Sequence, residues 1–64
     1  MPTIAITQTT GADRTTRAAI LKAVTAAYAE ASGANPTSVW VTMTEVEREN
    51  WAIGGETLAE RVTK

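Results

Sequence analysis

The chain has 64 residues, of which 44% are apolar, and six basic and seven acidic side chains give it a net charge of −1. It contains no cysteine and no histidine, which excludes disulfides, thiolate or imidazole metal sites, and serine–histidine catalysis. It also lacks a basic block and an apolar run of membrane-spanning length. We therefore expect one small domain over residues 1–64, without metal, cofactor, nucleic acid or membrane partner, in the cytoplasm.

An alternating segment from Pro2 to Thr9 opens the chain and predicts a strand, with Ile4 and Ile6 on one face and smaller residues on the other. Pro2 suits the first position of a strand because proline has no N–H to offer the ladder. It also has a chemical interpretation. Removal of Met1 would leave a secondary amine, and N-terminal amines titrate around pH ~8, close enough to neutrality to act as a base.

A helix is predicted from about Arg14 to Ser32, because the apolar period changes from two to that of one helix face. Asp13 is a good N-cap, and Gly33 is a natural C-terminal stop. The residues that share the expected inward face are Arg17, Ile20, Leu21, Val24, Ala27, Tyr28 and Ala31.

A second strand is predicted from Ser38 to Val46, with Val39, Val41 and Met43 on one face and Trp40 on the other. The segment "EREN" predicts a polar loop, and "WAIGGE" predicts a short extended segment. The tail "TLAERVTK" has the capping-box spacing Thr57–Glu60, which is compatible with a helical turn or with irregular structure.

Strand, helix and strand make a βαβ unit with parallel strands and a right-handed crossover. One helix covers one face of such a sheet, yet both strands carry apolar residues on both faces. A two-stranded sheet with an open face and open edges is not a stable monomer. The pattern therefore predicts that the uncovered face meets copies of the same chain.

These features together resemble the 4-oxalocrotonate tautomerase family. The resemblance covers nearly the whole chain and is carried by Pro2, the strand "SVWVTMTEV" and the block "NWAIGGE". It implies an α/β fold, a single βαβ unit with a short C-terminal hairpin, which dimerises into a four-stranded sheet and forms a hexamer as a trimer of dimers. It also implies a cofactor-independent tautomerase, in which Pro2 is the general base that moves a proton on a small enol or unsaturated keto acid.

The resemblance places Trp51 as an apolar wall beside the proline, with Ile53 near it. The chain departs from the family at two positions where arginines bind substrate carboxylates, which are Ala12 and Trp40 here. Neither can form a charge-assisted pair with a carboxylate. The other candidates for substrate binding are Arg14 and Arg17, which lie three residues apart on the first helical turn, and Trp40 itself, expected to line the pocket or to be buried between chains. Two weaker candidates are Arg48 and Glu45, the latter holding a water or pairing with an arginine.

Two alternatives stay open on the sequence. The chain could be a hydratase or dehalogenase of a small unsaturated acid, with protonated Pro2 as an acid and Glu45 as the candidate activator of water. If Met1 is retained, Pro2 is a tertiary amide without a basic nitrogen. In that case the sequence favours a non-catalytic oligomeric subunit.

Overall fold

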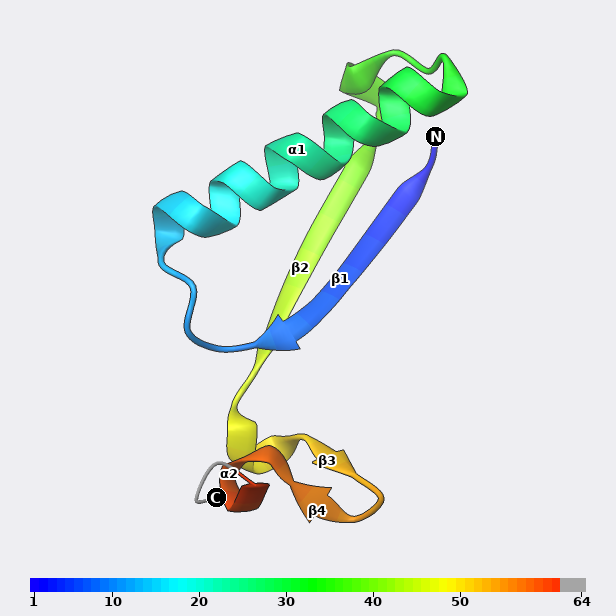
Figure 1. The fold of residues 1–64 in the computed structure, drawn as a ribbon. Coiled ribbons are helices and arrows are strands. Elements are labelled where there is room, and N and C mark those ends of the chain that lie inside the picture. Colours follow the sequence, from blue (N-terminus) through cyan, green and yellow to red (C-terminus); the bar gives the residue numbers. More distant parts are fainter. Residues whose placement is uncertain (62–64) are drawn as a thin grey trace.

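The computed structural model describes residues 1–61, which form a βαβ unit followed by a small C-terminal hairpin (Figure 1). Within these residues, no helix is both long and apolar enough to cross a membrane. The elements in chain order are β1 (Thr3–Thr9), α1 (Arg14–Ser32), the 3₁₀ turn η1 (Pro36–Ser38), β2 (Trp40–Val46), the 3₁₀ turn η2 (Arg48–Asn50), β3 (Ala52–Ile53), β4 (Glu56–Thr57) and α2 (Leu58–Arg61).

The two long strands are parallel, and their register runs from Thr3 opposite Trp40 to Thr9 opposite Val46. Helix α1 lies across one face of this sheet (Figure 1). Along both strands, half-buried residues alternate with exposed ones, as a sheet covered on one side requires. The predicted βαβ unit and the facing of both strands are therefore confirmed.

The second strand begins two residues later than the sequence predicts. Residues 36–38 form the η1 turn instead, because the side chain of Asn35 accepts a hydrogen bond from the Thr37 N–H at 3.0 Å. Proline at the first position of such a turn loses no hydrogen bond. The predicted polar loop "EREN" likewise contains a 3₁₀ turn, and the first strand begins at Thr3 rather than at Pro2.

Helix α1 has the predicted bounds and both predicted caps. The Asp13 carboxylate accepts a hydrogen bond from the Thr16 N–H at 2.8 Å, and Gly33 ends the helix with a φ of 78°. The inward face is only partly as predicted. Ala29, which the pattern missed, is buried, whereas Ala27, Tyr28 and Ala31 are exposed. The helix crosses the sheet at an angle (Figure 1), so the contacting stripe shifts along its length.

The C-terminal segment folds on itself beyond the carboxyl end of β2 (Figure 1). Gly54 and Gly55 join β3 to β4 with positive φ values of 61° and 88°, which the tightest hairpin turns need. Thr57 and Glu60 form the predicted capping box, with their reciprocal N–H donations at 2.9 and 3.2 Å. A short helix follows, so the helical alternative is confirmed as far as Arg61; residues 62–64 of that tail lie outside the described part.

The packed core of one chain is very small. Ala29 and Val39 are the only buried apolar residues among residues 1–61. The accessible surface is 4713 Å², whereas a compact monomer of this mass exposes about 4,000 Å². The radius of gyration is 15.0 Å, against about 11 Å for a compact domain of this length. One chain therefore exposes surface that a stable fold of this size would bury.

Asp13 also makes helix stability depend on pH. The Thr16 N–H stabilises its ionised form and holds the pKa of the carboxyl below its ordinary value of 3.8. Because the pKa is lower in the folded chain, the stabilisation is present above the unfolded pKa and is lost as the pH falls through the folded pKa.

We expect Asp13→Asn, which still caps the helix but does not titrate, to lower the melting temperature at pH 7 and to approach the wild type below about pH 4. Asp13→Ala should be less stable than both at pH 7. Thermal unfolding followed by circular dichroism, at pH 7 and at a pH below about 4, tests this. A wild-type advantage over Asp13→Asn that does not change with pH would contradict it.

Candidate active site

The amino end of the sheet brings Pro2 next to Trp40. The Trp40 N–H donates to the Pro2 carbonyl at 3.0 Å, so the two main chains lie side by side where the sheet begins. Pro2 is half-buried, whereas Met1 ahead of it is 82% exposed. Removal of Met1 would leave the proline nitrogen at this edge of the sheet.

Trp40 lies on the face of the sheet that α1 does not cover, and it is 56% exposed. Its neighbours on this face are small or medium-sized and are also exposed: Thr3 is opposite it, and Ala5 and Thr42 follow. The indole is the largest apolar group on this face, and within the described chain no other side chain of its size shares the face.

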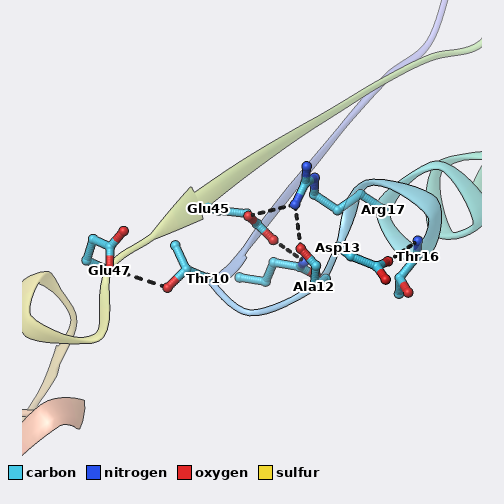
Figure 2. Close-up of polar contacts among 8 residues, drawn as sticks. Thr10, Ala12, Asp13, Thr16, Arg17, Glu45 and Glu47 are labelled. Carbon is cyan, nitrogen blue, oxygen red and sulfur yellow. Dashed lines mark hydrogen bonds and ion pairs between the residues drawn. The ribbon is translucent and has the colours of Figure 1, made fainter.

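The carboxyl end of the sheet carries a polar cluster that joins both strands to the start of α1 (Figure 2). Gln8 Nε2 donates to Glu45 Oε2 at 3.0 Å, and Arg17 Nη1 lies 3.4 Å from Glu45 Oε1. Arg17 Nη1 also donates to the carbonyl oxygen of Ala12. The predicted pairing of Glu45 with an arginine is thus observed. The partner Gln8 was missed, although the parallel register sets it opposite Glu45.

The two arginines of the first helical turn differ in their partners. Arg17 is half-buried and its charge is compensated by Glu45. Arg14 is exposed, and no hydrogen bond or ion pair to it is found within residues 1–61. Arg14 is therefore the cation of this turn whose donors are available to an external anion.

The hairpin carries the remaining candidates, Trp51 and Ile53. Trp51 is half-buried, and its carbonyl accepts a hydrogen bond from the Leu58 N–H at 2.8 Å, which closes the segment on itself. Ile53 is 55% exposed. Both residues belong to the C-terminal segment, which lies beyond the carboxyl end of β2 (Figure 1).

One chain does not bring its candidate residues together. Pro2 and Trp40 lie at the amino end of the sheet, whereas Arg14, Arg17 and the hairpin lie at or beyond the carboxyl end. The seven residues of β1 separate the two groups by about 20 Å. Residues 1–61 of one chain also enclose no cavity. Arg14 and Arg17, the predicted substrate-binding arginines, are therefore not near Pro2 in their own chain.

Charge is distributed unevenly between the two ends. The four arginines all lie in elements at the carboxyl end: Arg14, Arg17, Arg48 and Arg61. Lys22 lies midway along α1, and the last turn of that helix has no basic residue. Among the described residues, Glu30 is the charged group nearest the amino end along the helix. Among residues 1–61, no lysine or arginine therefore lies near Pro2 in its own chain.

Comparisons with known proteins identify the class to which this fold belongs. The sequence profile of the tautomerase enzyme family matches residues 2–63. The chain belongs to the tautomerase family. The resemblance to 4-oxalocrotonate tautomerases is thereby confirmed at the level of the family.

Individual relatives agree with this assignment. The chain is 35% identical to TomN, a 4-oxalocrotonate tautomerase homologue of the tomaymycin biosynthetic pathway, over 98% of this chain and 97% of that one, with a TM-score of 0.94. It is 30% identical to a heterohexameric 4-oxalocrotonate tautomerase from Chloroflexus aurantiacus J-10-fl, over 94% and 97% of the two chains, with a TM-score of 0.88. It is also 40% identical over 42 residues to "Probable tautomerase K2" of Dickeya dadantii; that match spans 66% of this chain and 63% of the relative's length.

Proposed function

We propose that this chain is a cofactor-independent isomerase that moves a proton on a small enol or unsaturated keto acid, with the amine of Pro2 as the general base. Membership of the tautomerase family supports an isomerase-type enzyme. The observation that carries the assignment to Pro2 is its position at the exposed amino edge of the sheet, behind an accessible Met1.

The chemistry requires a neutral amine. With Met1 removed, the Pro2 nitrogen has a lone pair that can accept the hydroxyl proton of an enol and return a proton to the neighbouring carbon. The carbon–carbon double bond becomes single and the carbon–oxygen bond becomes double, so no cofactor or other reactant is consumed. Burial of the amine between chains would favour its neutral form.

We further propose that the site is shared between copies of the chain in a homo-oligomer, with a hexamer built as a trimer of dimers. Two copies related by a two-fold axis normal to the sheet run antiparallel, so the amino end of one lies beside the carboxyl end of the other. This arrangement would bring Pro2 of one copy toward arginines and the hairpin of another. The related enzyme from Chloroflexus aurantiacus is itself a hexamer, of the hetero type. A cytoplasmic location stays a prediction of the sequence.

In this arrangement, Arg14 and Arg17 bind the substrate carboxylate, and Trp51 and Ile53 form the apolar wall that lowers the polarity around the amine. The hydratase alternative is less well supported. Both carboxylate oxygens of Glu45 already accept hydrogen bonds, from Gln8 and Arg17, so this group is poorly placed to activate a water.

The arginine roles can be tested by comparing two replacements. We expect Arg14→Ala to lower kcat/KM for carboxylate substrates by about 1.5–3 kcal/mol, because a charge-assisted hydrogen bond is lost. Arg17→Ala should lower both kcat/KM and the melting temperature, since it also breaks the pair with Glu45. Lys22→Ala, an exposed change in the middle of α1, is the control. Unchanged kinetics in a variant with both arginines replaced would remove this carboxylate site and leave the base untouched.

The function itself is tested by a panel of enol and keto acids assayed with the mass-verified processed chain and with Pro2→Ala. Turnover above the spontaneous rate that depends on Pro2 supports the proposal. A complete panel without Pro2-dependent turnover would contradict it and would favour the non-catalytic subunit.

A further inference from the structure

We propose that the substrate carries one carboxylate and, on the other side of its reacting carbons, a planar apolar group that packs against Trp40. This inference rests on the proposed function, since it concerns the substrate of the Pro2 reaction. It follows from three features of the chain: the position of Trp40, the absence of cations around it, and the number of arginines free to bind an anion.

Trp40 is the large side chain next to the reacting residue. Its N–H is bonded to the Pro2 carbonyl, and its indole lies on the uncovered face with 56% of the residue exposed. The residues around it on that face, Thr3, Ala5 and Thr42, are too short to cover the ring. A flat aromatic surface is therefore available within one residue of the Pro2 position.

The electrostatics at this end of the chain exclude a second carboxylate from the same position. No lysine or arginine of residues 1–61 lies near Trp40 along either strand, and Glu30 toward the end of α1 has the wrong sign. A carboxylate that loses its water against an indole without a partner charge is strongly disfavoured. An aromatic or conjugated group would gain apolar contact and favourable ring stacking there.

The arginines that a second copy could contribute also point to one carboxylate. Arg17 is paired with Glu45 and bonded to the Ala12 carbonyl, and Arg61 lies 4.0 Å from Glu56. Arg48 has no ion pair either, but it lies between Glu47 and Glu49 in the chain. Arg14 is the arginine of residues 1–61 that has no ion pair and only one adjacent acid, its helix cap Asp13. This single least-compensated cation suits one carboxylate.

Two substrates with the same reacting atoms distinguish a planar apolar group from a second carboxylate beside Trp40. The enols of phenylpyruvate and of oxaloacetate share the enolpyruvate unit and differ in carrying a phenyl ring or a carboxylate on the carbon that receives the proton. In both, the hydroxyl proton is taken by the amine and a proton is delivered to that carbon. The measurement is kcat/KM for ketonisation of each enol by the processed chain, after subtraction of the spontaneous rate.

We expect the wild type to favour the phenyl substrate, and Trp40→Ala to lower the ratio of the two kcat/KM values by about tenfold. Trp40→Phe, which keeps an aromatic face, should retain most of the preference. Trp40→Arg should invert it by supplying the missing cation. The control is Tyr28→Ala, which removes an exposed aromatic group on the helix and should leave the ratio unchanged. Sedimentation of each variant verifies its assembly.

A wild-type preference for oxaloacetate enol, or a ratio unaffected by Trp40→Ala in an assembled variant, would overturn the inference while Pro2-dependent turnover still stood. If Trp40→Ala fails to assemble, the wild-type ratio and Trp40→Phe decide the question. Absence of Pro2-dependent turnover of either enol would overturn this inference together with the proposed function.

Discussion

Dilution should unfold this protein instead of releasing a folded monomer. In one chain, Ala29 and Val39 are the only buried apolar residues of the described part. One face of its two-stranded sheet is open, and its surface exceeds that of a compact chain by several hundred Å². Such a chain cannot offset the conformational entropy of folding on its own. Its stability should therefore come from burial between copies and depend on protein concentration.

Sedimentation equilibrium and far-ultraviolet circular dichroism over the same dilution series test this expectation. The loss of the oligomer and the loss of helical signal should coincide, and the melting temperature should rise with concentration. Tryptophan fluorescence should change in the same range because the surroundings of Trp40 and Trp51 change when the copies separate. A folded monomer that is stable at micromolar concentration would contradict the account of the sheet face.

Pro2→Ala should impair proton transfer without abolishing it. The change replaces a secondary amine by a primary amine at the same edge of the sheet, so a base remains but its basicity and its position change. Loss of a well-positioned acid–base group typically costs about 10²–10⁴-fold. We expect a decrease in kcat/KM toward the lower part of that range. The fall should appear with every enol that the wild type accepts.

The matched control is Pro36→Ala, since Pro36 is the other proline of the chain and is exposed at the start of η1. It should leave kcat/KM unchanged, with at most a small loss of stability. Equal rates for Pro2→Ala and the wild type, with processing of both verified by intact mass, would show that the nitrogen of residue 2 is not the base.

Much of the fold could be predicted because local signals agree with it. Period-two segments, the Asp13 cap and Gly33 define the βαβ unit to within two residues at every boundary. The sequence-based prediction is wrong at two points: the start of the second strand and the buried face of the helix. Asn35 caps a turn that delays the second strand, and the crossing angle of α1 moves Ala29, instead of Ala27, into the core. Neither effect is encoded in periodicity alone.

The site could be predicted less completely. The sequence indicates Pro2 and both arginines by residue type, but their separation follows from the parallel strands, which set Pro2 at one end and α1's first turn at the other. Spacing on one helix face cannot distinguish Arg14 from Arg17. The difference arises because Glu45, supported by Gln8 across the register, compensates only the second. A site shared between copies has no signature in the linear order of residues.

The most direct test of the central claim is the activity of two forms of the same chain that differ only in Met1. With Met1 removed, the Pro2 nitrogen is a secondary amine; with Met1 retained, it is an amide without a basic lone pair. Both forms are separated and verified by intact mass, and kcat/KM for enol-to-keto conversion is measured for each. We predict that activity belongs to the processed form and that the retained form loses more than Pro2→Ala does. Undiminished activity in the form that keeps Met1 would contradict the claim that the Pro2 amine transfers the proton.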